Sequence, residues 1–261
     1  MSERDGYQPG VPCWVDTLQP DPDAATAYYG AVFGWDFDGP GPMPGGGRYF
    51  VARLRGRDVA GVGSLPPGAP PSWSTYVQVE STDAAAERAL EAGGHVVAEP
   101  FDAPPAGRIA VLADPGSASI CVWEPGERKG AQLVNEPGAW AMSALQAHDT
   151  EGAKAFYGAV FGWTTESFGP DVTMFRLPGY VGGEPQQPVS REVVATMLPA
   201  QDGRQQWVPD FWVHDVDEAA ARSGERGGSV LAGPFDTPVG RTAVLADPQG
   251  VPFTVTRIAV P

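Results

Sequence analysis

The chain has few of the residues from which metal centres, disulfide frameworks and basic surfaces are built. Its 261 residues include two cysteines and three histidines, and Lys129 and Lys154 are the only lysines. Cys13 and Cys121 form no CxxC pair and no cluster with histidine, which argues against a structural zinc site. Two isolated cysteines are also too few for a disulfide framework, so we expect both thiols to be reduced.

Positive charge and long apolar runs are scarce as well. Seventeen Lys and Arg residues stand against thirty-two Asp and Glu residues, which gives a formal net charge of −15. Nucleic acid and anionic membrane surfaces repel such a chain. No stretch of eighteen apolar residues occurs, and the start, Met-Ser-Glu-Arg-Asp, lacks the apolar segment of a signal peptide. We therefore expect a cytoplasmic protein that has no nucleic-acid partner and no membrane partner.

The most informative feature that is present is an internal repeat. The nonapeptide Ala-Tyr-Tyr-Gly-Ala-Val-Phe-Gly-Trp at 27–35 returns at 155–163 with a single change, Phe156 in place of Tyr28. A second motif, Gly-Arg-x-Ala-Val-Leu-Ala-Asp-Pro, occurs at 107–115 and again at 240–248. One folding unit is therefore used twice in this chain.

Each half carries the same order of secondary-structure signals. A short strand is followed by a helix, by several strands and by a second, Ala-rich helix inserted among them. The first helix is capped by Asp21 with Pro22 at its first position, or by Asp149 in the second half. It ends at Gly34 or Gly162, and the repeat closes with a strand after the Asp-Pro turn. Strands and helices in this order favour a sheet with helices on one face.

These motifs resemble those of a two-module member of the vicinal oxygen chelate superfamily, which includes glyoxalase I, extradiol dioxygenases and bleomycin-resistance proteins. Trp14-Val-Asp16 and Trp123-Glu-Pro125 are similar to its antigen-type, "glyoxalase-like" branch. The resemblance implies an α+β fold. It further implies two tandem βαβββ modules that form a curved mixed sheet around a cavity, with the helices outside.

The repeat also sets the expected domain boundaries. We place the first module at 8–126, a linker at 127–137 and the second module at 138–261. Relatives pair such modules within or between chains, so both a monomer and a homodimer remain open.

The resemblance further implies where a metal would be held. In metal-using members, one ligand comes from the first strand and one from the last strand of each module. The matching positions here are Asp16 and Cys121 in the first module, and Ala144 and Thr254 in the second. Ala cannot bind a metal and Thr is a poor sole oxygen ligand, whereas a catalytic divalent ion needs about three protein ligands. We therefore expect no metal and no cofactor.

Strand alternation indicates which side chains face the cavity. Trp207 and Phe211 share an apolar face that belongs under the helices, whereas Asp210, Trp212 and His214 share the open face. An aromatic lining with few polar groups suits a flat, largely apolar aromatic ligand with a few oxygens. The expected ligand-binding residues are Trp14, Arg53, Tyr76, Gln78, Cys121, Trp123, Ala144, Trp212 and Thr254.

Three residues of the expected lining are candidates for proton transfer. Asp16 lies beside Trp14 and is a general acid or base whose pKa is raised by the indoles, or a strand carboxylate bonded to backbone or Arg. Asp210 interrupts an apolar strand, where an unpaired carboxylate is costly. His214 transfers protons or is a solvated or capping residue before the next helix.

Three functions are compatible with this pattern. The first is a metal-independent enzyme that acts on an aromatic, polyketide-like metabolite by acid–base chemistry, as in a dehydration or cyclisation. The second is a drug- or metabolite-binding resistance protein without chemistry, and the third is a metal-dependent glyoxalase or dioxygenase. We favour the first, with the second close behind.

Overall fold

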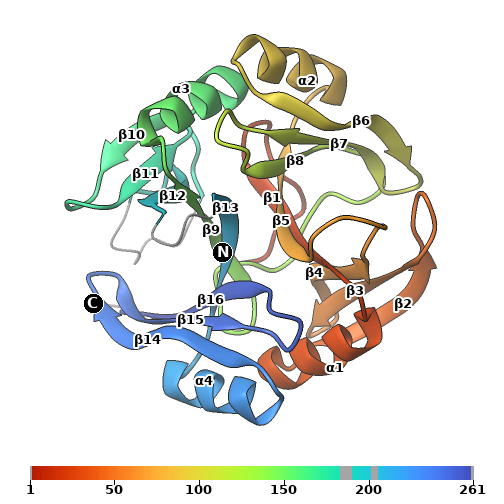
Figure 1. Cartoon of the computed structure of the whole chain (residues 1–261), viewed down its shortest axis with the longest axis vertical. Coiled ribbons are helices and arrows are strands. Elements are labelled where there is room, and N and C mark those ends of the chain that lie inside the picture. Colours follow the sequence, from red (N-terminus) through yellow and green to blue (C-terminus); the bar gives the residue numbers. More distant parts are fainter. Residues whose placement is uncertain (1, 183–189, 201–204, 260–261) are drawn as a thin grey trace.

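The computed structural model describes residues 2–182, 190–200 and 205–259, which form two eight-stranded mixed sheets with helices at the periphery (Figure 1). The elements of the first sheet are β1 (Pro12–Gln19), α1 (Pro22–Phe33), β2 (Asp36–Pro42), β3 (Arg48–Leu54), β4 (Arg57–Ser64), β5 (Ser72–Gln78), α2 (Thr82–Glu91), β6 (His95–Ala103), β7 (Gly107–Ala113) and β8 (Ser119–Pro125). Its strand order is β2-β3-β4-β1-β5-β8-β7-β6.

The second sheet repeats this arrangement. Its elements are β9 (Trp140–Ala147), α3 (Thr150–Phe161), β10 (Thr164–Ser167), β11 (Thr173–Arg176), β12 (Val193–Pro199), β13 (Gln206–Trp212), α4 (Val216–Glu225), β14 (Ser229–Thr237), β15 (Gly240–Ala246) and β16 (Pro252–Ile258). The strand order, β10-β11-β12-β9-β13-β16-β15-β14, is that of the first sheet shifted by eight strands. No helix in the described part of the chain is both long and apolar enough to cross a membrane.

The predicted α+β fold of two tandem modules with external helices is confirmed, although the modules form two curved mixed sheets and not one. Each repeat is itself two βαβββ units in succession, which share one sheet through the antiparallel pairing of β1 with β5 and of β9 with β13. The sequence indicated one unit per half because some of the outer strands lack a strand-like pattern. Strand β2, for example, reads Asp-Phe-Asp-Gly-Pro-Gly-Pro and is largely exposed.

The helix caps lie where the sequence predicts them. The Asp21 carboxylate accepts a hydrogen bond from the backbone N–H of Ala24 at 3.0 Å, and Asp149 accepts one from Gly152 at 2.9 Å. Both helices end at a glycine with φ of 74°, a left-handed conformation that favours residues without a Cβ. Local sequence therefore sets the start and the end of α1 and α3.

The repeated motifs meet across the two halves. The Tyr29 hydroxyl, on α1, accepts a hydrogen bond from Trp73 Nε1 at 3.1 Å and donates one to Asp247 Oδ2 at 2.8 Å. Asp247 belongs to the Ala-Asp-Pro turn of the other half. In each half, the nonapeptide tyrosine thus bonds to the turn aspartate of the opposite half.

The reciprocal set has matching geometry. Tyr157, on α3, accepts a hydrogen bond from Trp207 Nε1 at 2.9 Å and donates one to Asp114 Oδ2 at 3.1 Å. Gln205 also donates to Asp114, at 2.9 Å. Both aspartates are buried, and burial raises the pKa of each.

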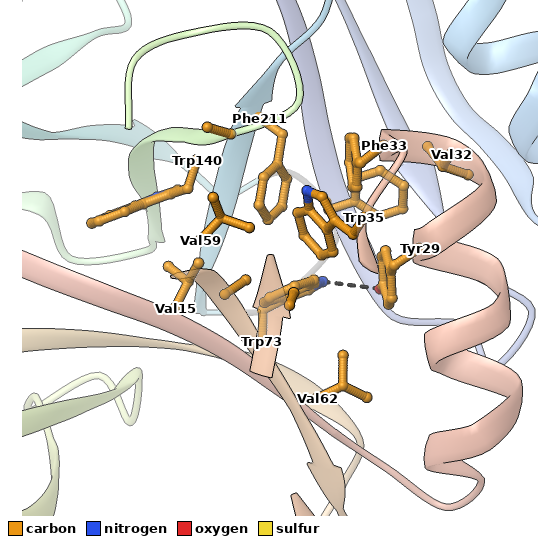
Figure 2. Close-up of a cluster of buried hydrophobic side chains, with 14 of the residues drawn as sticks. Val15, Tyr29, Val32, Phe33, Trp35, Val59, Val62, Trp73, Trp140 and Phe211 are labelled. Atoms are coloured by element: carbon orange, nitrogen blue, oxygen red, sulfur yellow. Dashed lines mark hydrogen bonds between the residues drawn. The ribbon is translucent and has the colours of Figure 1, made fainter. Parts of the chain in front are cut away.

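Aromatic packing surrounds each of these hydrogen-bonded sets. Figure 2 shows Phe211, on β13 of the second sheet, beside Phe33 and Trp35 at the end of α1, with the Trp73–Tyr29 hydrogen bond below. The Phe211 ring centroid lies 4.8 Å from that of Phe33 and 5.6 Å from that of Trp35. Helix α1 therefore packs on both sheets, and each of the two hydrophobic clusters formed by the described residues contains side chains from both halves.

We predict that Tyr29→Phe lowers the free energy of unfolding by about 2–3 kcal/mol, because it leaves the buried Trp73 N–H without an acceptor and Asp247 without one of its donors. Urea unfolding followed by circular dichroism measures this loss. Tyr28→Phe is the matched control, because the Tyr28 hydroxyl bonds only to Ser223 Oγ, at 2.7 Å. Equal losses for the two variants would contradict a special role for the Tyr29 hydroxyl.

Candidate functional site

A cavity of about 1080 Å³ lies against the second sheet. Every strand of this sheet except β10 contributes to its lining, and Arg4, Tyr7, Val134 and Asn135 complete one part of the wall. Drug-sized ligands occupy pockets of about 300–1,000 Å³, so this volume suits a ligand of several fused rings.

The lining is predominantly apolar and aromatic. Strand β13 presents Val208, Asp210 and Trp212 to the cavity, whereas Trp207 and Phe211 are buried on the helix side. The face assignment made from strand alternation is therefore confirmed for β13. Other large side chains in the lining are Tyr7, Trp140, Met142, Phe168, Met174, Tyr180 and Phe235.

Two carboxyl groups line the cavity: Asp171 is exposed in the loop between β10 and β11, whereas Asp210 lies within the apolar surface of β13. Asp210 Oδ1 accepts a hydrogen bond from Thr256 Oγ1 at 2.7 Å, and Oδ2 has no hydrogen-bond partner among the described residues. Burial raises the pKa of Asp210 to about 7, against the smaller lowering effect of the Thr256 hydroxyl. Near neutral pH this group is therefore divided between its acid and its base forms.

The concave face of the first sheet is filled by side chains. Asp16, on β1, is 3% exposed, and its Oδ2 accepts hydrogen bonds from Tyr76 at 2.9 Å and Tyr49 at 3.0 Å. The Tyr49 hydroxyl also accepts from Trp14 Nε1 at 2.9 Å, and Trp123 packs edge-to-face on Tyr76. Burial raises the pKa of Asp16 to about 6, although the two tyrosine hydroxyls lower it.

Two glycines of β4 make room for the Tyr49 ring. A Cβ at Gly61 would lie 1.9 Å from the Tyr49 hydroxyl oxygen, and one at Gly63 would lie 2.9 Å from Tyr49 Cδ2. Tyr49 therefore lies directly on the sheet and closes the space over Asp16. In β12 the corresponding stretch carries Thr196 and Leu198, which line the open cavity.

The structure thus divides the expected ligand-binding residues into two groups. Ala144, Trp212 and Thr254 line the cavity of the second sheet together with Asp210. The first-sheet residues are buried around Asp16 and do not line it; they are Trp14, Tyr76, Cys121 and Trp123. The single lining expected from the sequence is replaced by one open and one filled face, because Tyr76 and Trp123 stand where the second sheet has Asp210 and Thr256, and Tyr49 covers Asp16.

The remaining candidates lie away from the cavity. Arg53 forms ion pairs with Asp38 and Asp58, and the Gln78 amide donates to the backbone oxygen of Tyr7. His214 is exposed in the turn between β13 and α4. Burial raises the pKa of the Cys121 thiol far above its usual value, so this thiol is not a ready nucleophile.

Comparison with known proteins identifies the family. A family model described as a glyoxalase-like domain matches residues 14–123 and again 130–256. The chain belongs to the glyoxalase-like family. Its two matched segments correspond to the two sheets, so each half of the chain is one glyoxalase-like domain.

Relatives with curated descriptions match the glyoxalase-like chain over nearly its whole length. It is 38% identical to the putative glyoxylase CFP32 of Mycobacterium tuberculosis, over 99% of both chains. It is 33% identical to the anthracycline biosynthesis proteins DauV of Streptomyces sp. strain C5 and DnrV of Streptomyces peucetius, over 97% of this chain and 94% of each relative.

Solved structures support the same fold. The Mn(II)-bound glyoxalase from Novosphingobium aromaticivorans superposes with a TM-score of 0.65 at 17% identity, over 95% of this chain and 82% of that one. The 2,3-dioxygenase LapB from Pseudomonas sp. KL28 gives 0.63 at 12% identity, over 98% and 95% of the two chains. The glyoxalase-like chain therefore has the vicinal oxygen chelate fold that its sequence resembles.

The donor atoms of the cavity do not fit the metal ion that this fold holds in some of its members. At the matching positions the glyoxalase-like chain has Ala144 on β9 and Thr254 on β16, so Asp210 is the one carboxylate between them. Among the described residues, no three His, Cys, Asp or Glu side chains come together as a ligand set. A catalytic divalent ion takes about three such ligands.

Sequence reasoning missed several residues of the site. Thr256 lies two positions after Thr254 on the same face of β16, and Thr242 of β15 lies opposite Thr256. Strand alternation could therefore have identified both threonines. The position of the Tyr49 ring had a weaker signal in the sequence, namely the alternating glycines Gly61 and Gly63 of the neighbouring strand β4. The contribution of Arg4 and Tyr7 to the cavity wall is a long-range contact without a local pattern.

We predict that Asp16 makes the protein less stable as the pH rises. Its folded pKa of about 6 lies above the ordinary Asp value near 4, so the folded state binds the proton more tightly. The stabilisation is complete below about pH 4 and is lost as the pH rises through 6, a change of about 3 kcal/mol for this group.

Urea unfolding of wild type and Asp16→Asn at pH 4.5 and pH 7.5 isolates this contribution. The free energy of unfolding of the wild type, relative to that of Asp16→Asn, should be lower at pH 7.5 than at pH 4.5. Asp102→Asn, at an exposed carboxylate, is the control. A wild-type-minus-variant difference that is independent of pH would contradict the raised pKa.

Proposed function

We propose that this protein is a tailoring enzyme that acts on an aromatic polyketide of the anthracycline type by acid–base chemistry at Asp210. The observation that carries the proposal is the large apolar cavity with one carboxyl group of near-neutral pKa on its surface. The relatives DauV and DnrV, described as anthracycline biosynthesis proteins, support the substrate class.

The cavity suits such a ligand in shape and in chemistry. A flat, multi-ring ligand buries a large apolar surface between Trp212, Phe235 and the other aromatic walls. The threonine hydroxyls and the Asp210 carboxyl supply the few polar contacts that keto and hydroxyl oxygens require. A general acid or base operates best when its pKa lies near the working pH, and Asp210 meets that condition.

A dehydration or cyclisation of a polyketide ketone uses both forms of this carboxyl group. The Asp210 carboxylate takes a proton from the carbon next to a ketone, and the freed electron pair forms a carbon–carbon double bond. As the carbon–oxygen bond at the next carbon breaks, the leaving hydroxide takes the proton back from Asp210 and departs as water. The residue returns to its starting state, and no electron is gained or lost.

Asp16 has a different role in this proposal. Its carboxyl is closed in by Tyr49 and Tyr76, so we assign it to the structure of the first sheet and not to the chemistry. His214 and Arg53 are likewise assigned no part in the reaction, because neither lines the cavity.

We predict that Asp210→Asn lowers turnover of an anthracycline-type polyketide ketone by about 100-fold or more, because the amide cannot exchange a proton at neutral pH. Mass spectrometry of the reaction mixture measures turnover over a panel of such ketones. Asp16→Asn, at the buried carboxyl of the other half, should turn over normally. Undiminished turnover by Asp210→Asn would overturn the assignment.

The same experiment separates an enzyme from a binding protein. If the wild type binds the panel tightly by calorimetry and returns every compound unchanged, sequestration without chemistry is the function. The aromatic cavity supports that second reading equally well, and only the near-neutral carboxyl favours chemistry.

We predict that the reaction needs no divalent metal, because no three His, Cys, Asp or Glu side chains come together in the described part of the chain, whereas a catalytic ion takes about three such ligands. Turnover should survive dialysis against EDTA and should not rise when Mn(II) is added back. Calorimetric titration with Mn(II) should show no stoichiometric binding. Activity lost to EDTA and restored by Mn(II) would instead assign a metal-dependent glyoxalase or dioxygenase reaction.

A further inference from the structure

Two threonine hydroxyls connect to Asp210 from the neighbouring strands. Thr256, on β16, is 6% exposed and lies 2.7 Å from Asp210 Oδ1, and Thr242, on β15, lies 2.8 Å from the Thr256 hydroxyl. Thr242 and Thr256 are opposite each other in the antiparallel β15–β16 pairing, and both face the cavity. The three side chains therefore form a row across the sheet.

The direction of the hydrogen bonds in this row follows from the number of protons. A threonine hydroxyl has one proton, and that of Thr256 is given to Asp210 Oδ1. In the bond between the threonines, Thr242 must then be the donor. The reverse direction would leave the Thr242 proton without an acceptor, because its hydroxyl has no other hydrogen-bond partner among the described residues.

This direction distinguishes the two oxygens of Asp210. Oδ1 accepts a hydrogen bond from Thr256, whose hydroxyl in turn accepts one from Thr242. The two aligned hydrogen bonds strengthen one another in a low-dielectric environment. The proton of the acid form therefore belongs on Oδ2, the oxygen that has no hydrogen-bond partner among the described residues.

The first sheet provides an internal comparison. At the positions that match Asp210, Thr242 and Thr256 it carries Tyr76, Ile109 and Trp123. The sheet without the open cavity has neither the carboxyl nor the two threonine hydroxyls at these positions. The row is thus a feature of the cavity and not of the fold.

We propose that Thr256, supported by Thr242, is a positioning residue that orients the Asp210 carboxyl so that Oδ2 exchanges the proton with the ligand. This inference rests on the proposed role of Asp210 and adds the residues that set its orientation and its acidity. Neither threonine is required to touch the reacting atoms.

Carbon-13 NMR of protein labelled at the aspartate carboxyl carbons tests the inference without a substrate. The Asp210 resonance is identified by its loss in Asp210→Asn, and its wild-type titration midpoint should lie at about pH 7. Thr256→Val removes a donor to the charged form, so the midpoint should rise by about one pH unit or more. Thr256→Ser should restore it, and Thr242→Val should give a smaller rise.

Thr254→Val is the matched control. Thr254 lies two residues earlier on the same face of β16 and lines the same cavity, but no hydrogen bond joins its side chain to Asp210. Its loss should leave the midpoint unchanged. An unchanged midpoint in Thr256→Val, or an equal rise in Thr254→Val, would overturn the inference.

Turnover measurements keep this inference separate from the proposed function. If both hold, the pH–rate profile of Thr256→Val shifts alkaline in step with its NMR midpoint, and Thr256→Ser follows the wild type. If Asp210→Asn turns over normally while the midpoint of Thr256→Val still rises, the proposed function fails and the hydroxyl row remains. If Asp210→Asn is inactive and the Asp210 titration midpoint is unchanged in Thr256→Val, the positioning role of Thr256 fails and the proposed function stands.

Discussion

The arrangement of this molecule depends on the crossed hydrogen bonds between tyrosine and aspartate. Tyr29 of the first half bonds to Asp247 of the second, and Tyr157 of the second half bonds to Asp114 of the first. Each carboxyl is buried beside a helix that comes from the other half, so neither half can satisfy its own polar groups alone. These bonds therefore hold the two sheets against each other.

The same bonds explain which parts of the sequence are duplicated. The nonapeptide and the Ala-Asp-Pro turn supply the tyrosines and the aspartates, and each set takes its tyrosine from one copy and its aspartate from the other, so both sets form only when both copies keep both motifs. The strand positions that face away from the helices carry no such requirement. They have diverged into a filled face around Asp16 and an open one around Asp210, which confines the candidate chemistry to the second half.

Much of the fold was predictable because its signals are local. Capping aspartates, terminal glycines and strand alternation each act over a few residues, and the face of β13 was assigned correctly from alternation. The exposed strand β2 gave no such signal. Alternation also could not show whether the inward face is open, because Tyr49 reaches Asp16 across thirty-three residues and rests on glycines of a third strand.

The filled face of the first sheet has a consequence for how such a protein acquires new ligands. Its aromatic side chains are buried in the first sheet and do not line the cavity. Substitutions that reshape recognition are therefore expected mainly on the cavity face of the second sheet. The cavity-facing positions of the second sheet can therefore change without altering the tyrosine–aspartate bonds, because those bonds lie on the helix side of both sheets.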